Sequence, residues 1–545
     1  MPRRRLPRRR LLRRRLVRRR LSRRELVHCA ARIAASSRLL ALLALLVLLA
    51  PSASTTVSAQ ELAPLEGFDP YARAAREDWE TPGLAIAVVA DGRIVFERGY
   101  GTRRLGDESA DAQVDEHTLF AIGSTTKAMT AALVGMLVDD GKLGWDDPVI
   151  DRFPDFRLHD PVATREVRVR DLLTHNAGLP NADYLWYEQD IDPEEIVRRL
   201  RFVEPAYSLR SEFIYQNVMY AAAGELIEAV AGESWHQMLR RRILEPLDMS
   251  RTATSWREAA SRSNVAEPHD LVEGRLTTIE NASVDAVAPA GSVWSSVHDM
   301  ARWMRFLLAG GVGPDGARLL SEATIATLFR PHTMVGPEDF YPTARLTEPH
   351  WTTYSLGWFQ ADYRGRRVDF HTGSIDGMVA ICALLRDEGV GVYALANRDH
   401  AELRHALMYR VFDLFDPRLE GGGELRDWSA ELQQLYAELA EEAEQRRREA
   451  RERRVEGTRP RLPLERYTGS YQDRLYGEVE VALEGDELHV RYGRRTGRAD
   501  HWSYDTFRVR WDARWRGESS LSFDLDRNGE VAALTLDGLT LARQR

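Results

Sequence analysis

Hydrophobic and polar positions divide the chain into regions with different periodicities. Early in the body of the chain, the apolar run 84–90 is followed by the pair Asp91-Gly92 and by a second extended run, 93–100. Two extended runs joined by an Asp-Gly pair are typical of a β-hairpin. Apolar residues with helical spacing come next, and they predict helices over residues 125–139, 193–202, 218–231 and 297–308.

Strand patterns return after these helices, over residues 368–371, 378–386 and 390–397. Because strands come first and last and helices fill the middle, the order predicts an α+β fold. Both ends of the region would contribute to one antiparallel sheet flanked by helices, with a helical lobe inserted. We assign residues 60–418 to this domain. A domain of about 360 residues is large for a single core, so we expect two lobes with a cleft between them.

The pattern changes after residue 418. Three glycines at 421–423 are followed by apolar residues spaced three and four apart, which indicates one face of a helix: Leu425, Trp428, Leu432, Leu435 and Leu439. We interpret residues 419–463 as a charged linker helix surrounded by solvent. A short coiled-coil seam between two chains is the alternative.

The last region, residues 464–545, follows a period of two. Apolar residues alternate with polar ones at Val479, Val481 and Leu483, and the pattern resumes at Leu488 after a turn that contains Gly485. Alternation of this kind with short turns predicts antiparallel strands. We therefore expect a small all-β module at the end of the chain.

The first 59 residues have a composition of their own. Arginine triplets run from Arg3 to Arg20, an uninterrupted apolar run covers residues 39–50, and small residues precede Gln60. This order is typical of a cleaved secretory signal peptide. The twelve apolar residues are fewer than the roughly 20 that cross a bilayer. We expect a periplasmic or secreted mature chain that begins near Gln60, with membrane association only if the signal is retained.

Overall composition is that of an ordinary globular protein, with 44% hydrophobic and 29% charged residues among 545. The net charge of −8 conceals an asymmetry, because residues 60–545 contain 59 basic and 82 acidic residues. An acidic body argues against nucleic acid as a partner. The arginine tract alone could serve as a nucleic-acid arm, but a start codon placed too far upstream is the simpler explanation.

Cofactor and metal motifs are weak in this sequence. Residues 135–142 resemble a phosphate-binding loop, but the spacing between the glycines is wrong and Leu143 stands where a hydroxyl must bind magnesium. Cys382 is the one cysteine after residue 59, which excludes a Cys-rich zinc site. Residues 399–405 contain two histidines and a glutamate with a spacing that suits a surface helix better than a metal site. We expect no metal and no cofactor.

One motif carries clear chemistry. Ser124 and Lys127 lie three residues apart at the start of a predicted helix, so their side chains share one face. A serine nucleophile needs an adjacent base, and a lysine can serve when burial lowers its pKa from about 10.4. The helix N-terminus also supplies N–H groups for an oxyanion. The alternative is an N-capping serine beside a surface lysine.

Lysine usage favours the catalytic interpretation. The chain contains two lysines, Lys127 and Lys142, among 75 basic residues. The other 73 are arginines, which keep their proton at any working pH, whereas a lysine can release its proton. A lysine placed by chance three residues after a helix-starting serine is improbable in such a sequence.

Two further short motifs lie downstream. Tyr215 and Asn217 are two apart in an extended segment, so their side chains point to the same side. A phenol near a lysine can act as a base, and a carboxamide can bind a substrate amide. The segment His371 to Ser374 ends a predicted strand, where Gly373 permits a close approach of ligand and backbone. Taken singly, Tyr215 could be a core residue and His371 a structural one.

Together, the order and spacing of these motifs resemble those of the class C β-lactamase and DD-peptidase family of serine hydrolases, which are similar to penicillin-binding proteins. Additional stretches match at residues 120–123, 141–149, 172–179 and 289–299. The resemblance covers roughly residues 68–415. Residues 467–471 and 501–507 resemble the small β-barrel domain that is appended to many such hydrolases.

The resemblance implies catalytic roles for the motif residues. Ser124 would be the acylated nucleophile, and Lys127 and Tyr215 would share the role of base. The backbone N–H groups of Ser124 and Ser374 would form the oxyanion hole.

The resemblance also implies a substrate-binding strand. Asn217 would bind a substrate amide, and His371, Thr372 and Gly373 would line the substrate. His371 stands where β-lactamases usually carry a lysine that helps to bind the substrate carboxylate. A neutral histidine would do so poorly, which favours esters, amides or D-amino-acid peptides over β-lactams. The aromatic residues of the segment 184–187 would either line the acyl pocket or anchor a loop.

These features favour a secreted serine hydrolase that acts on a small-molecule or peptide substrate, through an acyl-enzyme on Ser124. The alternative is a penicillin-binding sensor or binding protein that is acylated without efficient turnover. A scaffold with an inactive site is a third reading, and the intact Ser124, Lys127 and Tyr215 argue against it. The oligomeric state cannot be derived from the sequence.

Overall fold

The computed structural model describes residues 65–419 and 425–544. The predicted signal peptide, residues 1–59, and the glycines 421–423 lie outside the described residues. In the described part, no helix combines the length and the apolar character that a membrane crossing requires.

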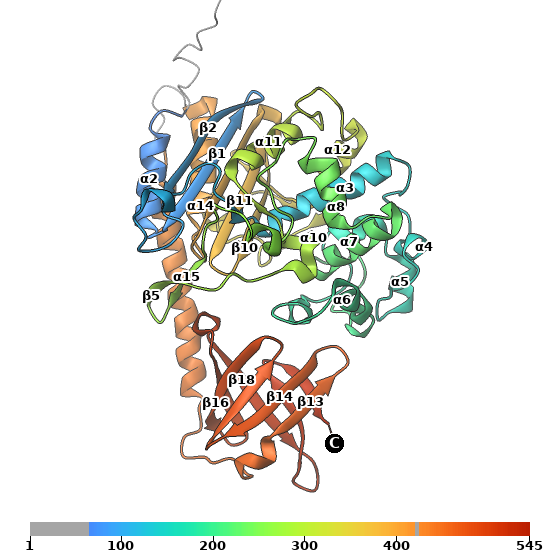
Figure 1. Cartoon of the computed structure of the whole chain (residues 1–545), viewed down its shortest axis with the longest axis vertical. Coiled ribbons are helices and arrows are strands. Elements are labelled where there is room, and N and C mark those ends of the chain that lie inside the picture. The colour runs from blue at the N-terminus through green and yellow to red at the C-terminus, as the bar shows by residue number, and fades with distance from the viewer. Residues whose placement is uncertain (1–64, 420–424, 545) are drawn as a thin grey trace, which may run out of the picture. The chain divides into compact units, whose positions relative to one another are not determined.

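The central feature is an eight-stranded antiparallel sheet with the order β2-β1-β12-β11-β10-β9-β8-β7. Figure 1 labels four of these strands, β2, β1, β11 and β10. Strand β1 pairs with β12, so the two ends of the domain meet in the sheet, and the predicted α+β fold is confirmed. The strands are β1 (Gly83–Ala90), β2 (Arg93–Gly101), β7 (Thr333–Met334), β8 (Thr352–Tyr354), β9 (Phe359–Tyr363), β10 (Arg366–Ile375), β11 (Met378–Leu385) and β12 (Val390–Ala396).

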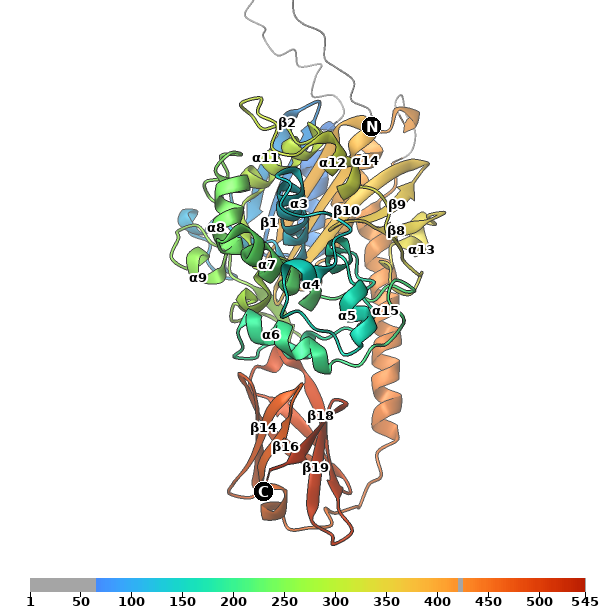
Figure 2. The same ribbon diagram turned by 90° about the vertical axis from the view of Figure 1, so that its right-hand side faces the viewer.

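Both faces of the sheet are covered by helices (Figures 1 and 2). Successive side chains of a strand point to opposite faces. Accordingly, Leu84, Ile86 and Val88 of β1 belong to one hydrophobic core, whereas the residues between them belong to another. The first core contains α2 (Phe68–Asp78) and α14 (Leu403–Leu414), and the second contains α11 (Val297–Leu308).

The remaining helices form a lobe beside the second face of the sheet (Figure 2). Its centre is α3 (Thr126–Asp139), which is buried along most of its length and packs against α7 (Val218–Ala231) and α10 (Ala288–Gly291). The smaller helices of the lobe are α4 (Val149–Arg152), α5 (Pro161–Glu166), α6 (Pro193–Arg199), α8 (Trp235–Leu239), α9 (Trp256–Ala259) and α12 (Glu322–Leu328). Helix α13 (Ala344–Thr347) lies outside the lobe, because Ala344 and Leu346 pack against the first core. Two short two-stranded sheets pair β3 (Phe120–Ala121) with β6 (Trp294–Ser295), and β4 (His269–Val272) with β5 (Arg275–Thr278).

Helix α15 (Trp428–Glu452) follows the sheet domain and differs from both sequence interpretations. Its first apolar residues, Trp428, Leu432 and Leu435, are buried in the same core as α14. The Trp428 indole donates a hydrogen bond of 2.8 Å to Asp413. The first half of the helix is therefore part of the sheet domain, and its apolar residues are not available for a seam between two chains.

The chain ends in a closed antiparallel barrel of eight strands, which confirms the small all-β module. Its interior is filled by aliphatic and aromatic side chains, among which Tyr467, Tyr471, Tyr492 and Trp511 are fully buried. The strands are β13 (Gly469–Asp473), β14 (Gly477–Glu484), β15 (Glu487–Tyr492), β16 (Arg495–Ser503), β17 (Thr506–Trp511), β18 (Glu518–Leu525), β19 (Val531–Leu536) and β20 (Leu539–Arg543).

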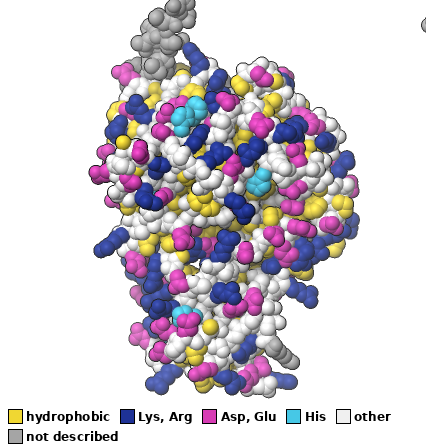
Figure 3. All heavy atoms as spheres, in the orientation of Figure 1, with side chains coloured by type: hydrophobic (Ala, Val, Ile, Leu, Met, Phe, Trp, Pro, Cys, Tyr) yellow, Lys and Arg dark blue, Asp and Glu magenta, His cyan; other side chains and the backbone are white. Residues whose placement is uncertain are grey.

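Acidic and basic side chains are interspersed over the face seen in Figure 3. Many acidic and basic side chains of the described residues form ion pairs with one another, such as the pair between Arg98 and Asp69 at 2.7 Å. This face therefore has no large field of a single sign.

Candidate active site

Ser124 lies in a tight turn between β3 and α3. The preceding residue, Gly123, has a left-handed φ of 51°. A Cβ atom at this position would lie 2.8 Å from the backbone nitrogen of Ser374, so a glycine is needed for the turn to approach β10. The backbone N–H groups proposed for an oxyanion hole, those of Ser124 and Ser374, therefore lie on two segments in direct contact.

Lys127 is completely buried one turn further along, and its amine is close to three oxygen atoms. The Nζ atom lies 3.0 Å from Ser124 Oγ, 2.7 Å from Asn217 Oδ1 and 3.0 Å from the Ala290 carbonyl oxygen. A neutral amine has two N–H bonds and one lone pair. The carboxamide and carbonyl oxygens can only accept, so they take the two N–H bonds and leave the lone pair for the hydroxyl of Ser124.

The surroundings of Lys127 also favour the neutral amine. Burial lowers the pKa of Lys127 to about 7, and the nearby Asp183 carboxylate partly opposes this shift. A substantial fraction of the amine is therefore unprotonated near neutral pH, as a general base requires.

Tyr215 lies against the same amine, with Lys127 Nζ 4.8 Å from the centre of its ring. Burial raises the pKa of Tyr215 well above the usual value, although a side-chain hydrogen bond with Ser124 acts in the opposite direction. The phenol is therefore protonated at neutral pH, so it is better placed to donate a proton than to act as a phenolate base.

Asn217 joins Lys127 to a residue that the sequence did not single out. Its Oδ1 atom accepts from Lys127, and its Nδ2 atom donates to Asp183 Oδ1 at 3.0 Å. These two bonds fix the orientation of the carboxamide. Asp183 could not be recognised from the sequence, because it lies in a loop with no recognisable motif, 34 residues before its partner.

The residues of β10 contribute in different ways. A Cβ atom on Gly373 would lie 1.9 Å from the Ile122 carbonyl oxygen. A glycine therefore allows this strand to contact the turn Gly123–Thr125, here called the nucleophile turn. Thr372 directs its hydroxyl away from the turn, to Tyr341 at 2.6 Å. Gly373 and Ser374 therefore adjoin Ser124, whereas the Thr372 hydroxyl is bonded within the protein.

His371 is buried and both of its ring nitrogens have protein partners. Nδ1 lies 2.6 Å from the Thr372 carbonyl oxygen, which requires the proton on this nitrogen, and Nε2 accepts from the Tyr354 hydroxyl at 3.0 Å. Burial, assisted by Lys127, lowers the pKa of His371 to about 3. His371 is thus neutral and has no free donor for a substrate carboxylate.

A second buried histidine supports Tyr215. His175 adopts a left-handed φ of 56°, and its Nδ1 atom accepts from the backbone N–H of Gln216 at 3.1 Å. Its ring centre lies 4.3 Å from that of Tyr215. His175 belongs to the matched stretch 172–179, but its packing role depends on partners about 40 residues away.

The expectation of a surface helix at residues 399–405 is wrong. Glu402, Arg404 and His405 are all buried, and the Glu402 carboxylate accepts from both other side chains. Arg404 also donates to the Gly373 carbonyl oxygen at 2.7 Å and to Ser374 Oγ at 3.0 Å. The cluster supports the strand beside the nucleophile because it lies directly behind it.

Metal-binding geometry is absent from the part of the chain that the structure describes. No group of three or more His, Cys, Asp or Glu side chains there is arranged to hold a metal ion.

The fold and the site define the class of β-lactamase-fold serine hydrolases. The comparison with protein families agrees, because residues 71–414 match the family described as Beta-lactamase. The chain belongs to this family. Residues 453–544, which include the barrel, match a second family described as a domain of unknown function, DUF3471.

Several curated proteins are similar to the chain. Unguisins hydrolase ungD of Aspergillus violaceofuscus is 31% identical over 469 residues, which cover 78% of each protein. Penicillin-binding protein 4 of Amycolatopsis lactamdurans is 31% identical over 344 residues, covering 61% of this chain and 84% of that protein. The family thus contains both a protein named as a hydrolase and one named for binding penicillin.

Solved structures share the fold. The octameric penicillin-binding protein homologue from Pyrococcus abyssi superimposes with a TM-score of 0.57 at 23% identity, over 88% of this chain and 100% of that one. At this level of identity the match supports the fold and carries no conclusion about assembly or substrate.

Proposed function

We propose that this chain is an exported serine hydrolase that forms an acyl-enzyme on Ser124 with an amide or ester substrate. The observation that carries the proposal is the position of the Lys127 amine. It lies 3.0 Å from Ser124 Oγ, while Asn217 and Ala290 occupy its two N–H bonds. A buried amine held in this way is an activated base for the serine nucleophile.

The reaction follows from this geometry. Lys127 takes the proton of Ser124 as Oγ attacks the substrate carbonyl carbon, and the N–H groups of Ser124 and Ser374 stabilise the negative oxygen. The protonated phenol of Tyr215 donates a proton to the leaving amine or alkoxide and regains one from Lys127. Water then attacks the acyl-enzyme by the reverse sequence of proton transfers and releases the acid.

The preferred substrates are those whose recognition does not require the enzyme to bind a carboxylate. His371 is neutral and its ring nitrogens are bonded within the protein. The strand therefore offers no cation where β-lactam recognition commonly uses one. Carboxylic esters, amides and D-amino-acid peptides are favoured over β-lactams as substrates.

A penicillin-binding or sensor protein is the second candidate. One observation favours it, the 31% identity to a protein named penicillin-binding protein 4. The identity to a protein named as a hydrolase extends over more of this chain. Turnover separates the two candidates, because a sensor would be acylated once per molecule and would release product very slowly.

The experiment uses the full chain and two variants, Ser124→Ala and Lys127→Arg. Each is exposed to a fluorophosphonate and to a chromogenic β-lactam, and the adduct is located by mass spectrometry. We expect an adduct on Ser124 of the wild type, none in Ser124→Ala, and labelling slowed by about 10²–10⁴ in Lys127→Arg, as expected for loss of a general base. Turnover of p-nitrophenyl esters and D-aminoacyl peptides is then measured.

Two results would overturn the proposal. Substrate turnover by Ser124→Ala would show that another nucleophile is used. Wild-type labelling rates in Lys127→Arg would remove Lys127 as the base. Export is tested separately, because N-terminal sequencing of exported protein that still contains residues 39–50 would contradict signal cleavage.

A further inference from the structure

A loop at residues 181–191, here called the Asp183 loop, contacts both the active site and the C-terminal barrel. It follows the buried segment that ends at Leu179 and leads into α6. The loop is neither helix nor strand apart from one short turn at Asp183–Leu185. Its conformation must therefore be fixed by side-chain contacts.

On the active-site side, the contacts converge on Asp183. Its Oδ1 atom accepts from Asn217 Nδ2 at 3.0 Å and from the Trp186 indole at 2.8 Å, and its Oδ2 atom accepts from Asn181 Nδ2 at 3.2 Å. No lysine or arginine of the described residues forms an ion pair with it within 4.0 Å. The carboxylate thus adjoins the chain of hydrogen bonds from Asn217 through Lys127 to Ser124.

The loop is also attached to the sheet. The Tyr187 hydroxyl donates to Asp376 at 2.7 Å, in the turn that follows Ser374 on β10. The backbone N–H of Tyr187 donates to the Asp183 carbonyl oxygen at 2.8 Å. Tyr187 therefore holds the loop against the turn that follows β10.

On the barrel side, the contacts converge on Glu188. The backbone N–H of Arg494 donates to its carbonyl oxygen at 2.8 Å, and its carboxylate forms ion pairs with Arg495 and Arg516. The Glu188 side chain is about one-tenth exposed, so these pairs are largely shielded from water. The barrel therefore binds the loop at Glu188, five residues after Asp183.

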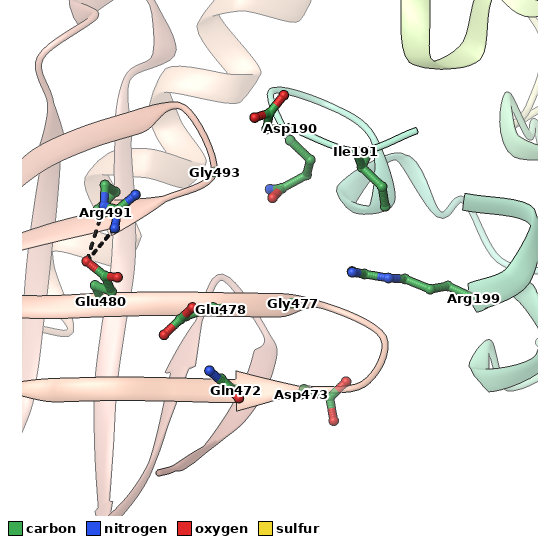
Figure 4. Close-up of a pocket in the computed structure, with 11 residues that line it drawn as sticks. Asp190, Ile191, Arg199, Gln472, Asp473, Gly477, Glu478, Glu480, Arg491 and Gly493 are labelled. Carbon is green, nitrogen blue, oxygen red and sulfur yellow. Dashed lines mark hydrogen bonds and ion pairs between the residues drawn. The ribbon is translucent and has the colours of Figure 1, made fainter. Parts of the chain in front are cut away.

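The turn between β15 and β16 fits closely under the loop. Figure 4 shows Gly493 in this turn beside Asp190 and Ile191, at the edge of a cavity of about 400 Å³. A Cβ atom on Gly493 would lie 2.4 Å from the Glu188 carbonyl oxygen. The close fit leaves no room for a side chain, so the barrel and the loop are in direct backbone contact.

We propose that Asp183 is a positioning residue that holds the Asn217 carboxamide in its hydrogen bond with Lys127. The C-terminal barrel keeps Asp183 in place by binding Glu188. The inference rests on the proposed function for the identity of the base. In this proposal the barrel affects catalysis through the Asp183 loop.

The charge of Asp183 gives the inference a direct readout. The titratable groups around Lys127 are His175, His371, Tyr215, Tyr220 and Asp183. Burial lowers the pKa of both histidines and raises the pKa of both phenols, so these four are neutral near pH 7. Asp183 is the anion of this group, and its loss must lower the pKa of Lys127 further.

The first experiment compares Asp183→Asn, Asp183→Ala and the control Asp190→Asn in the full chain. Asp190 lies in the same loop, and its side chain, which is 95% exposed, forms only a solvent-screened ion pair of 3.7 Å with Arg494. We expect Asp183→Asn to move the acid limb of the kcat/KM profile to lower pH, by about half a pH unit or more. Asp183→Ala should also lower kcat by about 10- to 100-fold, because Asn217 loses its partner. Asp190→Asn should match the wild type.

The titration of Lys127 can be followed without any substrate. The chain has two lysines, so ¹³C-lysine NMR gives two signals, and Lys142→Arg assigns them. If the wild type is not acylated on Ser124, the proposed function fails, yet this titration still tests Asp183. An unchanged Lys127 pKa in Asp183→Asn, or Asp183→Ala activity within about twofold of wild type, overturns the inference.

The second experiment tests the barrel through two matched glycines. Gly493 and Gly485 both occupy barrel turns with left-handed φ values, 58° and 67°, but a Cβ atom on Gly485 meets nothing within 4 Å. Valine at either position strains the turn equally. We expect Gly493→Val to slow labelling of Ser124 by about tenfold or more and Gly485→Val to leave it within about twofold.

A milder variant protects this test against misfolding. Glu188→Gln removes the ion pairs with Arg495 and Arg516 and keeps the backbone contact, so it should slow labelling less than Gly493→Val. Circular dichroism reports whether each variant is folded. If folded Gly493→Val and Glu188→Gln both label at the wild-type rate, the barrel has no part in positioning Asp183.

Discussion

At the residue scale, Lys127 determines how the activity depends on pH. Burial lowers its pKa to about 7, and the base is the unprotonated form. We therefore predict that kcat/KM for a neutral ester rises with pH through an apparent pKa near 7 and is lost as pH falls below it. The measurement is the pH profile of kcat/KM. A rate that does not change between about pH 5 and 9 would contradict Lys127 as the base.

Gly373 is the residue at which a single methyl group should have the largest effect. Its Cβ atom would lie 1.9 Å from the Ile122 carbonyl oxygen, so Gly373→Ala must push β10 away from the nucleophile turn. We predict a loss of about 1–3 kcal/mol in the free energy of unfolding and loss of Ser124 labelling. Urea unfolding and fluorophosphonate labelling measure the two effects.

Gly365→Ala is the matched control for that prediction. Gly365 lies just before β10 with a left-handed φ of 71°, and a Cβ atom there meets nothing within 4 Å. The substitution strains the backbone but leaves the nucleophile turn alone. Equal loss of labelling in both variants would show that the contact with Ile122 is unimportant.

The sequence identified some residues of the site and missed others for a physical reason. Lys127 could be identified from the sequence because the chain uses arginine for almost every other positive charge. Asp183 and His175 could not be identified, because their roles come from partners 34 and 41 residues away in the chain. The same limit applies to His371, since the sequence could not show that its ring nitrogens are occupied by Tyr354 and the backbone.

At the element scale, helix α15 carries the next prediction. Trp428 is fully buried and bonded to Asp413, so Trp428→Ala should lower the free energy of unfolding by about 3–5 kcal/mol. Glu441→Ala, on the exposed second half of the same helix, should change it by less than about 0.5 kcal/mol. Denaturant unfolding measures both. Equal stabilities would mean that the helix does not contribute to the core.

Long elements were predictable from the sequence and short ones were not. Strands β1, β11 and β12 are continuous apolar runs of seven or eight residues, buried along their whole length. Strands β7 and β8 have two and three residues, which is too few to display a period. The apolar face of α15 could be recognised from the spacing of its residues. Its partner α14 could not, because the sequence does not show which helix packs against that face.

At the scale of the whole molecule, the structure indicates where the chain can be divided. The core that contains α14 also contains Trp428, Leu432 and Leu435. We predict that a chain of residues 65–456 folds, because it retains α15, and that a chain of residues 65–419 aggregates, because it exposes that core. Size-exclusion chromatography and circular dichroism distinguish the two results. A soluble, folded 65–419 chain would show that α15 is dispensable for the sheet domain.

The reactivity of the Cys382 thiol should measure how often the central sheet opens locally. It lies on β11 opposite His371 of β10, is 1% exposed, and is the one cysteine after residue 59. Burial raises the pKa of its thiol, so a thiol reagent can react with it only when the central strands separate. The rate of this reaction therefore depends on how often the sheet opens between β10 and β11. An inhibitor that stabilises β10 will slow this reaction, so the reactivity of Cys382 reports whether the neighbouring site is occupied.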